Sequence, residues 1–195
     1  QFMPSTFLSI AVDFDKDGKK DLINNAADAL ASTANYLKKA AWISGQPWGF
    51  EVKLPADFEY RTAGRIRKQS VSYWMNKGVV KINGEALNSP IQIKDIEWAQ
   101  AANDYSALHL KADDKVAILV PSGSDGPAFL VGRNFDAIYA YNASESYALA
   151  IALLSDQLAG RTGLKTAWPT DDPGLSRAQR RELQGLLILK GYEIG

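Results

Sequence analysis

The spacing of apolar and polar residues predicts helices on both sides of a more extended middle region. Residues 28–41 contain many strong helix formers and neither glycine nor proline, so they form the clearest predicted helix. Helical patterning returns over 135–141 and 146–158, and Gly160 ends the second of these segments. The chain therefore combines amphipathic helices with a different kind of structure between them.

The middle of the chain alternates short apolar runs with proline and glycine. A turn-rich stretch leads into alternating apolar residues up to Leu54, which predict an extended segment. One helix is predicted over 70–77, and 123–127 is expected to connect two strands as a hairpin. Further strands are expected over 79–82, 91–93, 116–120 and 128–131. We interpret residues 50–133 as a small α+β insert.

Helix-capping signals stand near both ends of the chain. Ser5 is expected to cap a short helix over 6–11. Ser176 and Gln179 have the spacing of a capping box, which predicts a helix start. Residues 168–174, which include two prolines and a glycine, are interpreted as a linker between domains.

An acidic loop after the first predicted helix reads Asp-Phe-Asp-Lys-Asp-Gly. Carboxylates at every second position, here Asp13, Asp15 and Asp17, are typical of loops that wrap oxygen ligands around calcium. Gly18 would provide a positive-φ turn, and Lys19 would contribute its backbone carbonyl. The alternative is a solvated acidic turn, because aspartate, lysine and glycine are also common in surface loops.

The end of this loop departs from the usual calcium pattern. A bidentate glutamate normally closes such a loop at its twelfth position, where this chain has Asn24. The closing ligand is therefore either Asn24 itself or the next acid, Asp28.

Composition excludes several classes of function. The 195 residues include 22 basic and 22 acidic side chains, and most basic residues are scattered, which argues against nucleic acid as the main partner. There is no cysteine, so disulfides, thiolate catalysis and zinc–thiolate sites are excluded. The single histidine, His109, lies in a strand-like run, where a structural or exposed role is favoured over a catalytic one. No apolar run approaches the length of a membrane span.

Aromatic residues paired with an amide mark a second candidate site. Tyr36 lies on the helix that follows the acidic loop, and Tyr141, Asn142 and Tyr147 flank the junction of two later helices. Aromatic rings stack on the apolar faces of sugars, and an asparagine can bond their hydroxyl or acetamido groups. On pattern alone, packing and helix capping are the stronger interpretation of these residues.

Four segments resemble one enzyme family in the same order along nearly the whole chain. They read QFMPST at 1–6, AVDFDKDG at 11–18, DALASTANYL at 28–37 and YNASESYALA at 141–150. Together they resemble the second half of the catalytic domain of the membrane-bound lytic murein transglycosylase B family. The resemblance implies a lysozyme-like α+β domain, mostly helical with a small β-containing insert.

The resemblance also implies an activity. Enzymes of this family cleave the bond between N-acetylmuramic acid and N-acetylglucosamine in peptidoglycan without water, and leave a 1,6-anhydromuramic end. One glutamate acts first as acid and then as base, and the acetamido group of the substrate stabilises the reacting centre, so no second carboxylate is needed. Peptidoglycan glycan strands are the implied partner, and the implied location is the periplasm of a Gram-negative bacterium, with outer-membrane association.

The family's site residues are assigned to the positions of this chain that match its motifs. The implied substrate-binding residues are Gln1, Phe2, Met3, Ser5, Tyr36, Tyr141, Asn142 and Tyr147. The implied ligands of a structural calcium ion are Asp13, Asp15, Asp17, Lys19 and Asp28.

Two departures limit the carry-over. The family's catalytic glutamate lies upstream of the Gln-Phe-Met-Pro motif with which this sequence starts, so we expect it outside these residues and expect this piece alone to be inactive. Glu145 lies beside the Tyr141–Asn142 pair, but nothing in the family pattern gives it a proton-transfer role. Ala140 stands where the family commonly has an arginine, which weakens the expected set of glycan contacts.

The C-terminal segment resembles a different module. Residues 175–195 are similar to the first helix of a peptidoglycan-binding module, and 1–167 to the C-terminal portion of the catalytic domain. Two alternatives to a transglycosylase remain: a non-catalytic muropeptide-binding module, and a calcium-stabilised scaffold that docks other cell-wall enzymes.

Overall fold

The computed structural model describes residues 3–92, 107–161, 163–171 and 174–192. Its α-helices are α1 (Pro4–Ile10), α2 (Ala26–Lys39), α3 (Val71–Asn76), α5 (Arg133–Asn142), α6 (Glu145–Leu158) and α7 (Arg177–Leu189). Its strands are β1 (Gly49–Lys53), β2 (Gln69–Ser70), β3 (Val80–Lys81), β4 (Ile91–Gln92), β5 (Ala107–Leu108), β6 (Lys115–Leu119) and β7 (Ala128–Val131). Short 3₁₀ turns cover Tyr60–Thr62 and Gly123–Asp125.

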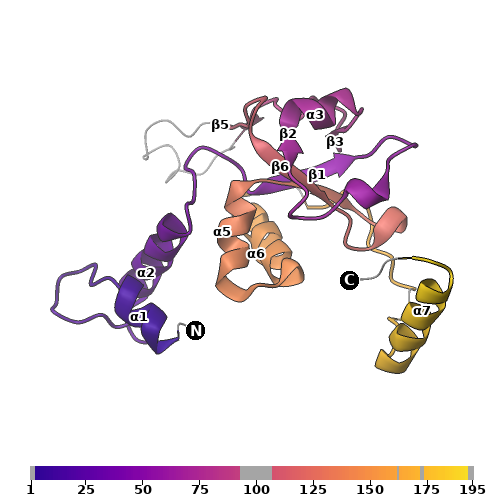
Figure 1. Cartoon of the computed structure of the whole chain (residues 1–195). Helices are drawn as coiled ribbons and strands as arrows, with labels where there is room; N and C mark the ends of the chain where they lie inside the picture. The colour runs from indigo at the N-terminus through magenta and orange to yellow at the C-terminus, as the bar shows by residue number, and fades with distance from the viewer. Residues whose placement is uncertain (1–2, 93–106, 162, 172–173, 193–195) are drawn as a thin grey trace.

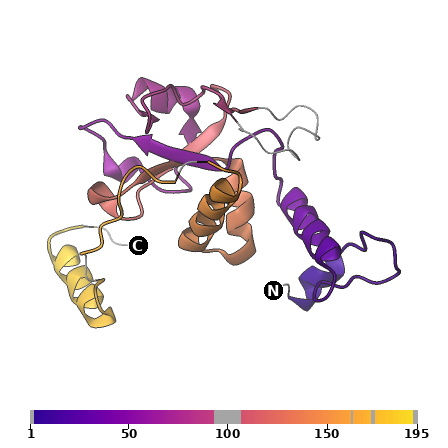
Figure 2. The ribbon, with the colours of Figure 1, turned by 180° about the vertical axis from the view of Figure 1, so that it is seen from behind.

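A five-stranded antiparallel sheet in the order β2-β6-β7-β1-β3 forms the centre of the molecule, and β4 pairs with β5 separately. Figure 1 shows α3 above this sheet and the α5–α6 pair below it, with α1 and α2 to one side and α7 to the other. Figure 2 shows the same arrangement from behind. The predicted hairpin connection over 123–127 is confirmed, because β6 and β7 pair directly.

Strand β7, in the middle of the sheet, is apolar throughout because both faces of the sheet are covered there. Phe129 and Val131 point to one face, where they pack with Trp48 and with residues of α5 and α6. Leu130 points to the other face, where it packs with Trp74 of α3. Since side chains alternate along a strand, two buried faces require a continuous apolar run rather than an alternating one.

The predicted helices are present, with corrections at their starts. Ser5 as an N-cap is wrong: α1 begins at Pro4 and its N-cap is Met3, which makes no side-chain cap bond. Proline is favoured in the first turn because its missing N–H needs no partner there, and this places Ser5 inside the helix. The α2 helix begins before the predicted residue 28, because the Asn25 side chain accepts hydrogen bonds from the next helical N–H groups.

The helix predicted over 70–77 and the predicted capping box are both confirmed. Ser70 caps α3, and Ser176 and Gln179 form both bonds of the predicted capping box at the start of α7. None of the α7 residues is buried. Across the described part of the chain, the helices are too short or too polar to cross a membrane.

The segment after α6 returns to the sheet. Glu51 on β1 is 8% exposed, and its two carboxylate oxygens accept the backbone N–H groups of Lys165 and Thr166, each at 2.8 Å. Trp168 follows and packs against Phe129, with ring centroids 6.2 Å apart. These contacts hold the chain against the sheet up to Trp168, the first residue of the predicted linker.

Candidate functional site

Three tyrosines from three helices meet at one place. The rings of Tyr36 on α2 and Tyr141 on α5 meet edge to face at 5.5 Å, and the Tyr147 ring on α6 stacks on Tyr141 at 6.2 Å with an interplanar angle of 18°. Partial burial, with a smaller contribution from Tyr141, raises the pKa of Tyr36 above its ordinary value. We call these three residues the tyrosine cluster. It joins residues that are more than 100 positions apart in the sequence.

The turn between α5 and α6 determines how Tyr141 and Tyr147 are placed relative to each other. Ala143 ends α5 in the left-handed conformation at φ 46°, and Ser144 then caps α6 by accepting the N–H of Tyr147. Asn142 is the last residue of α5 and is exposed. Among the described residues the Asn142 side chain has no hydrogen-bond partner, so the capping interpretation of its amide finds no support in the contacts.

The remaining predicted substrate residues lie near the start of the chain. Gln1 and Phe2 lie outside the described residues. Met3 is 69% exposed at the N-cap of α1, and Ser5 is exposed on the same helix, which packs against α2. The structure thus brings together Tyr36, Tyr141 and Tyr147, with Asn142 at the same helix corner.

The acidic loop brings three carboxylates together. Oxygen atoms of Asp13, Asp15 and Asp28 lie within 4.8 Å of one another, and we call these residues the aspartate group. Asp28 is fully buried, and its oxygens accept the N–H groups of Phe14 at 2.7 Å and Asp21 at 2.9 Å. One oxygen of Asp13, Oδ1, is buried without a hydrogen-bond partner among the described residues. A buried anionic oxygen of this kind fits a cation ligand.

Other predicted ligands point elsewhere. The Asp17 carboxylate accepts the N–H of Lys19 at 2.8 Å and is outside the aspartate group. The Asn24 amide donates to Asp21 instead of turning into the loop. Sequence reasoning missed Asp21, whose pKa is lowered mainly by the hydrogen bond from the Asn24 backbone. Gly18 adopts the expected positive φ of 89°, and its N–H donates to Asp13 Oδ2.

Sequence reasoning also missed a group of charged side chains around Arg65, which contacts residues of α5 and α6 and which we call the Arg65 node. Arg65 lies 3.2 Å from Asp136 on α5 and 3.6 Å from Glu145 on α6, and its guanidinium sits 3.7 Å from the centre of the Tyr139 ring. Lys68 pairs with the same Asp136 carboxylate. Arg65 and Lys68 lie close together in the sequence, but no sequence pattern indicates which residues they contact.

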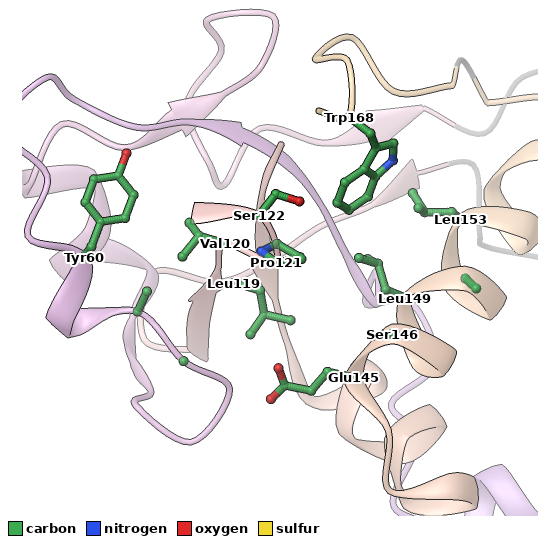
Figure 3. Close-up of a pocket in the computed structure, with 13 residues that line it drawn as sticks. Tyr60, Leu119, Val120, Pro121, Ser122, Glu145, Ser146, Leu149, Leu153 and Trp168 are labelled. Atoms are coloured by element: carbon green, nitrogen blue, oxygen red, sulfur yellow. The ribbon is translucent and has the colours of Figure 1, made fainter. Parts of the chain in front are cut away.

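A cavity of about 750 Å³ lies along the flank of α6, and we call it the α6 cavity. Figure 3 shows Leu149 and Leu153 of α6 facing Leu119 at the end of β6, with Trp168 at one end and Glu145 at the other. Sequence reasoning did not find this cavity, because its walls come from four separated segments.

Comparison with known protein families identifies the family of this chain. The family model described as "Transglycosylase SLT domain" matches residues 1–156. The chain belongs to the transglycosylase SLT domain family. This confirms the resemblance inferred from the four sequence segments.

Members of this family are similar to the chain in both sequence and fold. SltB3 from Pseudomonas aeruginosa, solved in complex with NAG-anhNAM-pentapeptide, is 44% identical with a TM-score of 0.83, over 100% of this chain and 47% of that one. The Escherichia coli lytic transglycosylase SLT35, solved in complex with calcium, is 25% identical with a TM-score of 0.55, over 82% of this chain and 42% of that one. Membrane-bound lytic murein transglycosylase B of Escherichia coli (strain K12) is 47% identical over 45 residues, which are 23% of this chain and 12% of that protein.

These matches confirm the fold class predicted from the sequence. The transglycosylase domain here is α+β and has lysozyme-like lytic transglycosylases as its structural neighbours. The chain spans about half the length of the solved SltB3 chain that it matches.

Proposed function

We propose that this chain forms part of the substrate site of a peptidoglycan lytic transglycosylase and holds the glycan beside the scissile bond. The observation that carries the proposal is the convergence of Tyr36, Tyr141 and Tyr147, with the exposed Asn142 amide at the same corner. A second structure of SltB3 was solved in complex with NAG-NAM-pentapeptide, which supports a peptidoglycan fragment as the ligand class. In this proposal Met3 and Ser5 line the same site, whereas Gln1 and Phe2, the other two residues carried over from this motif, lie outside the described residues.

The proposed reaction is non-hydrolytic cleavage between N-acetylmuramic acid and N-acetylglucosamine. A single glutamate protonates the leaving oxygen and then takes the proton from the C6 hydroxyl of the muramyl residue, which closes the 1,6-anhydro ring. We place that glutamate in a part of the whole enzyme that precedes residue 1. This chain contributes binding: the rings stack on the sugar, and the Asn142 amide bonds its polar substituents.

Glu145 is not proposed as the acid. Its carboxylate is 3.6 Å from the Arg65 guanidinium, which makes it an ion-pair partner of that arginine. The proposed reaction uses a single glutamate for both proton transfers, so it needs no second carboxyl group.

We further propose that the acidic loop holds a structural calcium ion. The aspartate group would supply the inner carboxylates, and Asp17 and Lys19 would complete the loop around them. The ion would neutralise the repulsion among the carboxylates and fix the loop against α2, the helix that carries Tyr36. Its role is to support the site, without contact with the reacting atoms.

The domain organisation and location follow from the same proposal. Residues 1–167 form the C-terminal portion of the catalytic domain, 168–174 a linker, and 175–195 the first helix of a peptidoglycan-binding module. The exposed apolar side chains of α7, among them Leu186 and Ile188, suit a helix that packs against the rest of such a module. The whole enzyme would act in the periplasm.

Calorimetric titration of the chain with NAG-NAM disaccharide tests the binding proposal. Saturable binding that weakens when Asn142 is replaced by alanine is the expected result. Extension of the chain with the upstream segment of the parent should then produce anhydromuropeptides from purified peptidoglycan. An absence of glycan binding would leave the calcium-stabilised scaffold as the better function.

A further inference from the structure

The α6 cavity has walls that the fold holds in place without a ligand. Trp168 is fixed on one side by its contact with Phe129 and by the two bonds from the preceding backbone to Glu51. The next residue, Pro169, packs so closely on the β6–β7 turn that a Cβ added at Gly126 would lie 3.3 Å from its ring. The cavity is therefore preformed, which lowers the entropic cost of binding.

The lining is mostly apolar, with a few polar groups at its ends. Pro121 lies between the Tyr60 and Trp168 rings, and Leu149 and Leu153 of α6 continue the apolar surface beside Trp168. Hydroxyl groups of Ser122 and Ser146 and the carboxylate of Glu145 supply the polar contacts. The side chain of Glu145 is 52% exposed and 3.6 Å from Arg65, so its oxygens can still accept hydrogen bonds from a ligand.

This lining suits a short peptide better than a sugar. A peptide offers apolar side chains together with spaced backbone N–H and C=O groups, which match an apolar groove with few polar partners. A sugar presents hydroxyl groups on most of its rim and would leave many of them unpaired here.

The α6 cavity begins beside the tyrosine cluster. Ser146 lines the cavity and Tyr147, the next residue, belongs to the cluster, so the two side chains point about 100° apart around α6. On a helix about 11 Å across, that angle corresponds to an arc of about 10 Å. A five-residue peptide spans up to about 17 Å. A peptide branch attached to a sugar at the cluster can therefore reach the cavity.

We propose that the α6 cavity binds the peptide branch of a peptidoglycan fragment whose sugar rests on the tyrosine cluster. The inference rests on the proposed function and adds a second contact area to it. It makes the peptide a part of what the protein recognises, and it predicts that glycans stripped of their peptides bind less tightly.

Titration with NAG-NAM and with NAG-NAM-pentapeptide tests this directly. The wild-type chain should bind the peptide-bearing ligand about tenfold more tightly. Ala150→Trp fills the cavity from an exposed helical position, so it should bring the affinity for NAG-NAM-pentapeptide down to that for NAG-NAM. Ser155→Trp, an exposed position on the same helix outside the cavity, should keep the full preference.

A second cavity variant keeps the test decisive if Ala150→Trp does not fold. Tyr60→Ala opens the opposite wall, and it should weaken binding of NAG-NAM-pentapeptide several-fold without changing binding of NAG-NAM. Melting temperatures establish that each variant is folded at the temperature of the titration. Equal wild-type affinity for the two ligands, or a preference that survives in both folded cavity variants, would overturn the inference and leave glycan binding intact. Failure of both ligands to bind would overturn the proposed function as well.

Discussion

The backbone N–H of Phe14 donates to Oδ1 of Asp28 at 2.7 Å, and this bond ties the acidic loop to the first turn of α2. Asp28 is fully buried, and it also lies in the group of carboxylates that converge in the loop. Tyr36 stands two turns further along the same helix. Order in the loop and the position of Tyr36 are therefore linked through one carboxylate.

Calcium should stabilise the chain. The carboxylates of the aspartate group repel one another in the empty loop, so ligand linkage predicts about 2.7 kcal/mol of added stability at a calcium concentration one hundred times the dissociation constant. For a domain of this size that corresponds to a rise in melting temperature of roughly 5–10 °C, measured against a chelator.

Replacement of Asp15 by alanine should remove most of this calcium effect, because Asp15 belongs to the aspartate group. Asp57→Ala, an exposed acid elsewhere in the chain, should leave the effect unchanged. Asp17→Ala decides whether Asp17 belongs to the ligand set. A melting temperature that does not respond to millimolar calcium would argue for a solvated acidic turn.

Asn142→Ala should weaken glycan binding with little effect on folding. A polar partner left unpaired in a desolvated site costs about 1–3 kcal/mol, so the dissociation constant for NAG-NAM should rise several-fold to over one hundredfold. Asn88→Ala, an exposed asparagine in the insert, is the matched control and should bind like wild type. If Asn142→Ala lowers the melting temperature and leaves the affinity of the folded protein unchanged, its role is structural.

Arg65→Ala should destabilise the corner between α5 and α6. The Arg65 side chain is 20% exposed and contacts Asp136, Tyr139 and Glu145, so its loss leaves a partly buried carboxylate with fewer partners. We expect a loss of about 1–3 kcal/mol in the free energy of unfolding, measured with urea. Arg61→Ala removes an arginine that is 84% exposed and should change that free energy by less than about 0.5 kcal/mol. Equal effects of the two variants would contradict the assigned role.

Asp156 should make stability depend on pH. Burial raises the pKa of Asp156 above its ordinary value, against the opposing effects of Arg161 and the Trp48 indole N–H. Because the folded-state pKa is raised, the protonated acid contributes stability that is present below the unfolded pKa of 3.8 and is lost as pH rises through the folded value.

Asp156→Asn should therefore gain stability relative to wild type as pH rises from about 3.5 to 6. The amide oxygen can still accept the Trp48 N–H, which stands at 3.0 Å in the wild type. Urea unfolding of both proteins across this pH range measures the difference. A difference that stays constant with pH would show that the folded-state pKa is not raised.

Local sequence signals predicted most helices and strands because they depend on neighbouring residues. The residues that form the capping box at Ser176, and those that make β7 a buried strand, lie within the segments themselves. The error at Ser5 arose where two local signals competed, since Pro4 favours an earlier start. The helix of Tyr36 could also be predicted, but its contact with Tyr141 depends on how two distant helices pack.

The Arg65 node and the α6 cavity could not be predicted in the same way. Arg65 and Asp136 are 71 residues apart, and only the folded sheet brings them together. Trp168 was interpreted as the start of a linker because proline and glycine follow it, yet its ring packs against Phe129. The family resemblance supplied the substrate residues, whereas residue patterns alone favoured a packing role for them.

The bonds from Lys165 and Thr166 to Glu51 have a consequence for the order of folding. Glu51 lies on strand β1, next to the central strand, and the N–H groups that its carboxylate accepts come 114 and 115 residues later in the chain. During synthesis from the N-terminus, β1 cannot bury this carboxylate at low cost until residue 166 has left the ribosome. The sheet should therefore complete late in translation, and a nascent chain that stops after α6 should be more open to proteases than one that extends a few residues further.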